Sequence, residues 1–262
     1  MPDALTYVVL AGGRGERLRP LTDLVPKPLL PMRTGARVID FTLANCLASP
    51  AGDCLVVAQY RADMIAEHVA TRWRRPFKAR GRRISTLRFD RKAPGAPEGT
   101  AVALLETLGQ MDAPSEDLVV LGGDHVYSMD YGEMVAAHRR SGAAATVAVV
   151  PRSPCDSRRF GIVLDGPGGI VEAYSEKPPT LDGLTRPGSP PLASMGIYAF
   201  STRKLRPLLE RDMDRMPQDI GHDLIPALAQ SGELRAFRFV QPDGSPRFWE
   251  DIGELDAYDR CR

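Results

Sequence analysis

The stretch at residues 5–22 constrains the fold and the chemistry of this 262-residue chain more than any other part of it. A short apolar run at residues 7–10 predicts a buried strand, and a glycine-rich turn follows it at once. Glycines let a backbone approach a polyphosphate closely and present N–H groups to it. Arginines in the same turn can neutralise phosphate oxygens. The loop therefore predicts a site for a nucleoside triphosphate; the alternative is a surface turn with solvated arginines.

Two familiar phosphate-binding motifs do not fit this loop. The dinucleotide fingerprint G-x-G-x-x-G needs a third glycine where this chain has Leu18. The P-loop needs Gly-Lys followed by Ser or Thr, and the loop has no such triplet. Those motifs bring one cationic side chain or none, whereas this loop carries Arg14, Arg17, Arg19 and, just beyond, Lys27.

Composition places the chain among ordinary globular proteins and argues against some partners. The length allows one large α/β domain or two small ones. The formal net charge is +1 and there is no long basic run, so we expect no nucleic-acid partner. No apolar run approaches the roughly 18 residues that span a bilayer, and the start lacks a signal-peptide pattern, so we expect a cytoplasmic protein without a membrane partner. Four cysteines without C-x-x-C spacing are expected as reduced thiols: Cys46, Cys54, Cys155 and Cys261.

Strand-like and helix-like runs alternate through about residue 150. This alternation predicts an α/β fold with a doubly wound, mostly parallel, Rossmann-like mixed sheet and helices on both faces. The predicted strands are residues 7–10, 55–59, 118–121, 145–150, 162–164, 170–174, 193–200 and 234–240. The predicted helices are residues 38–48, 62–72, 100–111, 131–141, 202–211, 223–230 and 254–260. Glycines and proline at 166–169 predict a hairpin, and residues 74–97 and 177–191 are expected as loops that frame a ligand site.

Carboxylates follow later apolar segments. Asp124 comes after the run at 118–121 and two glycines, a position that suits a hard cation such as Mg²⁺. Asp251, near the C-terminus, can supply a second carboxylate to the same ion. Each aspartate can instead cap a turn or a helix, and spacing does not separate these readings. Glu176 and Lys177 end another run, where they can hold sugar hydroxyls and a phosphate or form a solvated ion pair.

A set of short motifs follows one order along nearly the whole chain. The motifs are Ala11-Gly-Gly-Arg-Gly-Glu-Arg-Leu18, Pro26-Lys-Pro28, Ile39-Asp-Phe41 with Asn45-Cys46, Gln59-Tyr60, Gly99-Thr-Ala101, Gly123-Asp-His-Val-Tyr127, Phe160-Gly161, Glu176-Lys-Pro178, Ala193-Ser-Met-Gly-Ile-Tyr198, Asp223-Leu-Ile-Pro226 and Trp249-Glu-Asp-Ile-Gly253. In this order the chain resembles the sugar-phosphate nucleotidyltransferases, and within them most closely the bacterial glucose-1-phosphate adenylyltransferases (ADP-glucose pyrophosphorylases). A set of this size is far more specific than any one motif.

The resemblance implies a role for each matching position. Arg17 and Lys27 would hold the triphosphate and the charge that develops during transfer, with Arg14 assisting. Asp124 and Asp251 would bind the catalytic Mg²⁺, and Asp124 would count with Arg17 and Lys27 among the catalytic residues. The residues implied for the nucleotide are Leu10, Ala11, Gly12, Gly13, Arg14, Gln59, Gly99 and Thr100. The residues implied for the sugar phosphate are Gly161, Glu176, Lys177 and Ser194.

The implied reaction belongs to EC class 2.7.7. A nucleotidyl group would pass from a nucleoside triphosphate, with ATP favoured, to a sugar 1-phosphate, with glucose 1-phosphate favoured, and pyrophosphate would leave. The attacking phosphate monoester is largely ionised at neutral pH because its second pKa is about 6, so no general base is required. The reaction needs in-line positioning and neutralisation of an anionic transition state. His125 is accordingly expected in packing or beside the metal ligands.

Two departures keep alternatives open. The adenylyltransferases of glycogen and starch synthesis carry a left-handed β-helix, and no C-terminal β-helix is expected here; residues 1–262 are expected as one catalytic domain, with a nucleotide-binding part at about 1–125 and a sugar-phosphate-binding part at about 126–262. The lead-in at 93–98 lacks the aromatic pair usual in those enzymes. GTP, dTTP, CTP or UTP with another hexose or a cyclitol phosphate in secondary metabolism is therefore an alternative pair of substrates.

A non-catalytic regulatory homologue is a second alternative for the function, and a homo-oligomer is left open. A generic Rossmann cofactor binder is set aside because Asp40 lies too far beyond the glycines.

Overall fold

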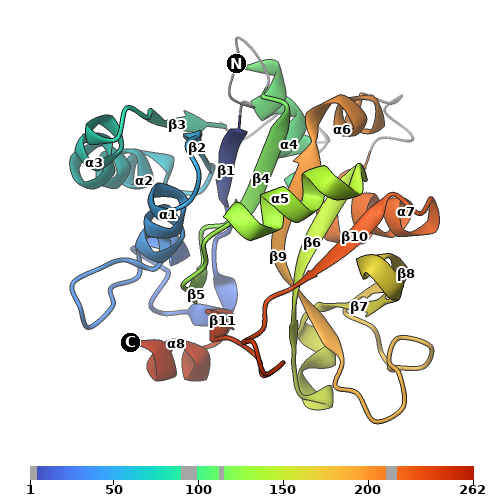
Figure 1. Ribbon diagram of the computed structural model, residues 1–262. Coiled ribbons are helices and arrows are strands. Elements are labelled where there is room, and N and C mark those ends of the chain that lie inside the picture. Colours follow the sequence, from blue (N-terminus) through green and yellow to red (C-terminus); the bar gives the residue numbers. More distant parts are fainter. Residues whose placement is uncertain (1–4, 90–98, 112–114, 211–216) are drawn as a thin grey trace. The chain divides into compact units, whose positions relative to one another are not determined.

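The computed structural model describes residues 5–89, 99–111, 115–210 and 217–262, which form two compact units (Figure 1). The first unit consists of Met1–Ala96, Val120–Gly132 and Phe248–Arg262. The second unit consists of Pro97–Val119 and Glu133–Arg247. Segments distant in the sequence therefore share one unit. The expected division of roles near residue 125 concerns function and stays a prediction.

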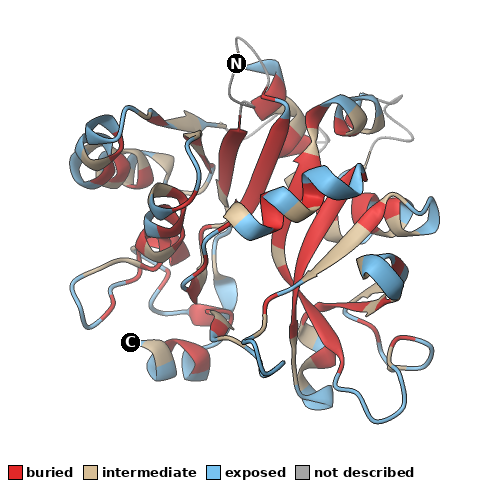
Figure 2. Cartoon of the chain, viewed as in Figure 1, coloured by how far each residue is buried: buried red, intermediate tan, exposed pale blue. Residues whose placement is uncertain are grey.

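The first unit is built on parallel strands. Its elements before the glycine-rich turn and after it are β1 (Leu5–Ala11), α1 (Val38–Ala48), β2 (Asp53–Ala58), α2 (Ala62–His68), the π-helical turn η3 (Val69–Trp73), α3 (Arg74–Ala79) and β3 (Ile84–Arg88). β1 pairs in parallel with β2, and β2 with β3. Such pairing requires helical crossovers, which α1 and the α2–α3 segment supply. β1 is buried along nearly its whole length (Figure 2), as a strand of a covered parallel sheet requires.

The loop predicted at residues 74–97 is wrong in its described part. α3 and β3 occupy most of it, and Figure 1 shows α2 and α3 beside β3. Trp73 and Phe77, four residues apart, are buried on one helix face, and Ile84 is buried where β3 begins. Most of the exposed positions between them are basic, and this concealed the apolar spacing. Residues 90–98 lie outside the described residues. They include the rest of the predicted loop and the whole lead-in at 93–98.

A small second sheet in the first unit was not predicted. β5 (His125–Tyr127) pairs antiparallel with β11 (Trp249–Asp251), which places Asp251 opposite His125. Each strand has three residues, too few for a periodic pattern, and more than 120 positions separate them. β4 (Asp117–Gly122) begins in the second unit and ends in the first, where it leads into β5, and α8 (Leu255–Cys261) follows β11.

The second unit has a mixed sheet. Its elements are α4 (Thr100–Gly109), α5 (Gly132–Ser141), β6 (Ala145–Pro151), the 3-10 helix η4 (Pro154–Arg159), β7 (Gly161–Asp165), the 3-10 turn η5 (Pro167–Gly169), β8 (Val171–Glu176), β9 (Leu192–Ser201), α6 (Thr202–Leu209), the π-helical turn η7 (Ile220–Leu224), α7 (Ile225–Gln230) and β10 (Leu234–Arg238). β6 pairs in parallel with β10 and antiparallel with β9. β7 and β8 form the predicted hairpin, and β7 also pairs with β9.

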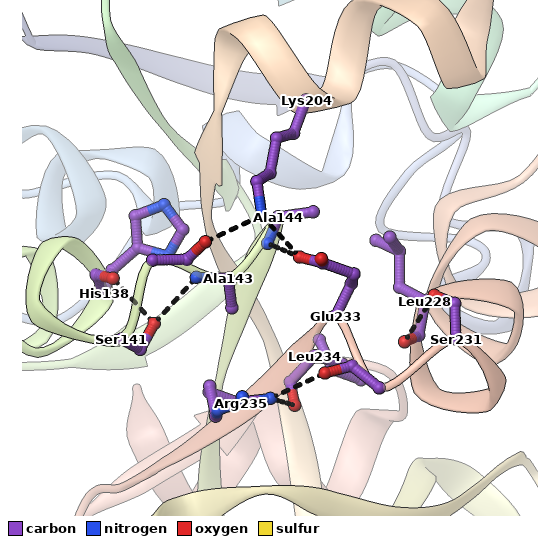
Figure 3. Close-up of polar contacts among 12 residues, drawn as sticks. His138, Ser141, Ala143, Ala144, Lys204, Leu228, Ser231, Glu233, Leu234 and Arg235 are labelled. Atoms are coloured by element: carbon purple, nitrogen blue, oxygen red, sulfur yellow. Dashed lines mark hydrogen bonds and ion pairs between the residues drawn. The ribbon is translucent and has the colours of Figure 1, made fainter.

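A partly exposed ion-pair network fixes the turns at one end of this sheet (Figure 3). Lys204 Nζ on α6 donates to the Gly142 carbonyl and to Glu233 Oε2, both at 2.8 Å. Glu233 Oε2 also accepts the Ala144 backbone N–H at 2.9 Å. One carboxylate thereby joins the turn before β6 to the turn before β10, which sets the register of the parallel pair.

The expected fold class is confirmed as a mixed, mostly parallel α/β sheet with helices. In the main sheet, the pairs described in the first unit are parallel, whereas the second unit combines the parallel pair β6–β10 with antiparallel pairs. Among the described residues, none of the helices has the length and apolar character that crossing a membrane demands.

The buried carboxylate of Asp40 joins α1 to the helical segment between β2 and β3. Oδ1 accepts hydrogen bonds from His68 Nε2 and Trp73 Nε1, each at 2.6 Å. Oδ2 accepts the Arg37 backbone N–H at 2.8 Å and faces Arg72 Nε at 3.2 Å. Burial alone would raise the pKa of Asp40, but the hydrogen bonds from His68, Arg37 and Trp73 outweigh it and hold the pKa below 3.8. The ionised form is therefore the one that stabilises this crossover.

We expect Asp40→Asn to lower the free energy of unfolding at pH 7 by about 2–4 kcal/mol, because it removes one charge of a buried, hydrogen-bonded set. A carboxyl whose pKa is lowered on folding stabilises the fold above its ordinary pKa, and this contribution is lost as the pH falls through the folded value. Urea unfolding between pH 3 and pH 7 measures both effects, and the variant is expected to show a shallower acid dependence than the wild type.

The control for this prediction is Asp63→Asn on α2, whose side chain is 87% exposed. Exposed pairs contribute little, so we expect a change within about 0.5 kcal/mol. Equal effects of the two substitutions would contradict the role given to Asp40.

Candidate functional site

The glycine-rich turn after β1 is shaped by Gly15. This residue has a φ of 68°, in the left-handed region that glycine adopts without strain, and it begins the 3-10 turn η1 (Glu16–Leu18). A Cβ at Gly15 would lie 2.9 Å from the Cβ of Lys27 and 3.0 Å from Cγ2 of Thr22. Thr22 Oγ1 donates to the Gly15 carbonyl at 2.8 Å. Glycine is thus required here by conformation and by space, and it lets the stem of Lys27 pack against the turn.

Lys27 lies between two carboxylates from distant parts of the chain. It begins the 3-10 turn η2 (Lys27–Leu29), and its Nζ donates to Asp124 Oδ2 at 2.6 Å and to Asp251 Oδ1 at 3.1 Å. The side chain of Lys27 is 10% exposed, whereas that of Asp124 is 33% exposed. The two aspartates predicted to share one ion therefore face the same point, and an ammonium group screens their mutual repulsion.

The pKa values of this group record the balance between burial and charge. Burial by itself would lower the pKa of Lys27, but the negative charges of Asp124 and Asp251 and their hydrogen bonds raise it overall. Burial would likewise raise the pKa of Asp124, but Lys27 and then His125 outweigh it and lower the pKa to about 2. Lys27 is therefore a cation and Asp124 an anion throughout the neutral range.

The helix-cap alternative for Asp251 is wrong. α8 begins at Leu255, and Glu254 stands at its N-cap position. Asp251 instead ends β11, and its Oδ1 accepts from Lys27. Spacing alone did not separate the two readings because an aspartate four residues before the first residue of a helix and one at its cap look alike in sequence.

Apolar neighbours of these polar residues form one small core in the first unit. Three of its members each directly follow a polar residue of the candidate site: Leu18 follows Arg17, Val126 follows His125, and Ile252 follows Asp251. The cluster consists of Leu18, Leu30, Met32, Val38, Val126, Ile252 and Tyr258. Burial of such side chains stabilises by about 1.5–3 kcal/mol each. The polar side chains thus point to one place because their neighbours share one core.

Helix α1 holds the segment that carries Asp124. Thr42 Oγ1 donates to the Gly122 carbonyl at 3.0 Å, just before Asp124. Asn45 Nδ2 donates to the Tyr127 carbonyl at 3.2 Å, and Asn45 Oδ1 accepts the Met129 backbone N–H at 3.3 Å. The short β5 therefore has its ends tied to one helix face. Asn45 was not predicted to have a role; its place in a matching motif was the signal that could have indicated one.

Asp124, His125 and Asp251 form a group that can hold a metal ion. One ligand atom from each lies within 4.8 Å of the others. His125 Nε2 is 3.5 Å from Asp124 Oδ1 and 3.9 Å from Asp251 Oδ1, and the ring packs edge-on against Trp249. Two carboxylates suit a hard divalent cation such as Mg²⁺, and imidazole suits a first-row transition metal. The donor set therefore fits a divalent ion.

The other nucleotide residues predicted in the first unit surround the same turn. Leu10 and Ala11 end β1, and the Leu10 carbonyl accepts the Gly123 N–H at 2.9 Å, one residue before Asp124. A Cβ at Gly253 would lie 3.6 Å from Nη2 of Arg17, so this guanidinium lies close to the Asp251 segment. The structure thus brings the ends of β1, β4 and β11 together. Gly12, Gly13, Arg14 and Gln59 belong to the same unit.

The predicted nucleotide residues Gly99 and Thr100 lie in the second unit, where α4 begins. Gly99 has a φ of 137°, and a Cβ there would overlap the Gln218 carbonyl oxygen. Thr100 Oγ1 donates to Asp219 Oδ2 at 3.0 Å and accepts the Ile220 N–H at 2.8 Å. Both residues are therefore fixed against the segment that leads into η7.

The four predicted sugar-phosphate residues also belong to the second unit. Glu176 Oε2 accepts from the Tyr174 hydroxyl at 2.6 Å, and its Oε1 is 3.6 Å from Lys177 Nζ. A Cβ at Gly161 would collide with the Tyr174 hydroxyl and Glu176, so only glycine fits opposite this pair. Ser194 is buried on β9. Lys177 has a φ of 46°, a conformation rare outside glycine, which concentrates at functional sites.

Known proteins are similar to this chain over nearly its whole length. Residues 6–261 match the protein family described as nucleotidyl transferase. A glucose-1-phosphate adenylyltransferase of Hydrogenovibrio crunogenus is 36% identical over 255 residues, which cover 96% of this chain and 60% of that protein. Glucose-1-phosphate adenylyltransferase 2 of Vibrio parahaemolyticus is 36% identical over 265 residues, with 98% and 65% covered. The enzyme of that name from Thermomicrobium roseum is 38% identical over 262 residues, with 97% and 58% covered. The chain thus spans 58% to 65% of the length of these relatives.

We expect Asn45→Ala to lower the free energy of unfolding by about 2–3 kcal/mol, because it leaves a buried carbonyl and a buried N–H without their partner. Thr42→Val, which removes one hydrogen bond and keeps the shape, is the matched variant and should cost about 1 kcal/mol. Chemical denaturation measures both. A loss for Asn45→Ala no greater than that for Thr42→Val would contradict the proposed anchoring of β5.

Proposed function

The chain belongs to the nucleotidyl transferase family, and on that premise we propose that it transfers a nucleotidyl group from a nucleoside triphosphate to a sugar 1-phosphate, with release of pyrophosphate. The observation that carries the proposal is Lys27 between Asp124 and Asp251, beside the arginine-bearing turn. A transferase of this kind must neutralise a polyphosphate and its developing charge, and these groups supply cations and metal ligands for that purpose.

In the proposed mechanism Arg17 and Lys27 bind the triphosphate and Arg14 assists. The backbone N–H groups of the turn approach the phosphates, which its glycines allow. The pKa of Lys27 is raised by the two carboxylates, after burial is overcome, so its ammonium keeps its charge when anions bind. Charge at this point stabilises the crowded phosphorus centre and the leaving pyrophosphate. Leu10, Ala11, Gly12, Gly13, Gln59, Gly99 and Thr100 are proposed as the remaining nucleotide residues.

Mg²⁺ is the proposed ion, held by Asp124 and Asp251. A bound divalent cation would supply charge neutralisation and orientation of phosphate oxygens. His125 lies beside these carboxylates and is not needed as a base, because the attacking phosphate is already largely ionised at neutral pH. Its edge-on packing against Trp249 fits a role in orienting the carboxylates.

In the second unit we assign the sugar phosphate to Gly161, Glu176, Lys177 and Ser194. Lys177 would hold the phosphate and Glu176 the sugar hydroxyls. The hydrogen bond from Tyr174 fixes Glu176 Oε2, which leaves Oε1 toward Lys177. Because Lys177 is 52% exposed, its ammonium is accessible to an anion.

ATP and glucose 1-phosphate are the proposed substrates. The support is that the relatives reported above are named glucose-1-phosphate adenylyltransferases and align with nearly the whole chain. The alternative is another base with another hexose or cyclitol phosphate. The lead-in at residues 93–98, which would meet the base, lies outside the described residues.

The direct test is pyrophosphate release with five nucleoside triphosphates (ATP, GTP, dTTP, CTP and UTP), each paired with a panel of sugar and cyclitol phosphates at saturating Mg²⁺. We expect the highest kcat/KM with ATP and glucose 1-phosphate. A different best pair would reassign the substrates and leave the reaction class intact. Absence of turnover with every pair, with folding verified, would favour a non-catalytic homologue.

We expect Asp124→Asn and Asp251→Asn each to reduce kcat at least about 100-fold, as loss of a group that stabilises transition-state charge does. Each should also weaken Mn²⁺ binding about tenfold or more, measured by electron paramagnetic resonance of the protein alone. Asp130→Asn is the control, because Asp130 lies on the same segment and its carboxylate accepts only from Gly132 among its described hydrogen bonds. Unchanged Mn²⁺ affinity in both site variants would refute the metal assignment.

A further inference from the structure

The turn between β2 and α2, residues 59–61, touches the arginine-bearing turn at three places. A Cβ at Gly12 would lie 2.9 Å from Gln59 Oε1, so the amide of Gln59 packs against the start of the turn. Arg14 approaches the ring of Tyr60, and Arg61 reaches the later part of the turn. All of these residues belong to the first unit. Of residues 59–61, only Gln59 carries a role implied by the matching motifs.

Two guanidinium groups lie near the ring of Tyr60. The Cζ atoms of Arg14 and Arg61 are 5.7 Å and 5.6 Å from the centre of its ring. Both distances are within the range of cation–π attraction. Arg61 Nε also donates to the Tyr60 hydroxyl at 3.2 Å. Arg14 is exposed, so the ring face restricts a long side chain that solvent would otherwise leave free.

Arg61 adopts a conformation that arginine rarely takes. Its φ and ψ are 48° and 44°, in the left-handed region, where a side chain costs about 1–2 kcal/mol. In this conformation Arg61 precedes α2, and its Nη2 donates to the Asp23 carbonyl at 2.9 Å. Asp23 in turn pairs with Arg19 at 3.3 Å. Strain of this kind persists where surrounding contacts impose it and is concentrated at functional sites.

We infer that Tyr60 and Arg61 are positioning residues of the triphosphate site. Tyr60 holds the guanidinium of Arg14 in one place, and Arg61 anchors the far end of the arginine-bearing turn through Asp23. A triphosphate then meets a turn whose cations are already ordered, so less conformational entropy is lost when it binds. This inference rests on the proposed function, because it assigns Arg14 and the turn to a nucleoside triphosphate.

The test compares Tyr60→Leu, which removes the ring, with Tyr60→Phe, which keeps the ring and removes the hydroxyl. The probe is ATP, together with the triphosphate of highest turnover in the substrate panel, titrated by calorimetry without sugar phosphate. We expect about tenfold weaker binding and a similar rise in the KM for the triphosphate in Tyr60→Leu, because two cation–π contacts are lost. The KM of Tyr60→Leu for the sugar 1-phosphate should stay within about twofold of the wild-type value. Tyr60→Phe, which keeps the ring, should bind the triphosphate within about twofold of the wild-type affinity.

Arg61→Gly is a second variant that separates positioning from folding. Glycine accepts the left-handed conformation, so the backbone keeps its path while the guanidinium is lost. We expect about fivefold weaker triphosphate binding with a melting temperature within a few degrees of the wild type. Arg75→Ala, at an exposed arginine of α3, is the control and should bind as the wild type does.

Three outcomes would overturn the inference. Wild-type affinity for the triphosphate in Tyr60→Leu and Arg61→Gly, with turnover intact, would refute it and leave the proposed function standing. An equal rise of the KM for both substrates would indicate a general structural effect. Failure of the wild-type protein to bind any triphosphate would refute the proposed function and this inference with it.

Discussion

The site depends on one electrostatic arrangement, the ammonium group of Lys27 between the carboxylates of Asp124 and Asp251. Two carboxylates brought this close repel each other, and burial adds a desolvation cost. The ammonium group of Lys27 offsets both the repulsion and the desolvation cost. The two carboxylates in turn offset the cost of burying Lys27, so the three charges stabilise one another. The arrangement also explains why Gly15 is needed: any side chain there would displace the stem of Lys27.

The polar groups are held by apolar and neutral contacts rather than by their own attraction. Leu18, Val126 and Ile252 belong to one core, and each follows a polar residue of the site by one position. From the other side, Thr42 and Asn45 on α1 hold the backbone on either side of Asp124. The rigid elements therefore fix the charges before any substrate binds, which is the condition for electrostatic catalysis at low reorganisation cost.

The charged side chains of the arginine-bearing turn, which are more exposed, are also held in place by contacts from a neighbouring element. Long cationic side chains lose much entropy when they bind an anion, and a turn made largely of glycines and arginines has few buried apolar side chains of its own. Contacts from the neighbouring β2–α2 turn supply order instead, through Gln59, the ring of Tyr60 and the anchor of Arg61. The strained backbone of Arg61 and that of Lys177 in the second unit mark two places where geometry is imposed against local preference.

Local patterns in the sequence determined the class of fold and which charged and phosphate-binding groups the chain supplies. Apolar runs that end in glycines predicted β1 and β4, and the order of motifs predicted the family, because a strand, a turn and a set of charged residues each leave a local signal. Residues 74–88 were assigned wrongly because basic side chains hid the buried positions Trp73, Phe77 and Ile84. The pairing of β5 with β11 left no signal, since three-residue strands show no period.

Only the tertiary structure decided that Asp251 faces Asp124 rather than caps a helix, and that Lys27 lies between them. It also decided that the guanidinium groups of Arg14 and Arg61 both lie near the ring of Tyr60. The sequence by itself determined which charges the chain carries and which turns can approach a phosphate. It did not determine their convergence, because convergence depends on contacts between segments up to 224 positions apart. Such contacts are selected by burial of a shared core, and no local pattern records which apolar residue will meet which other.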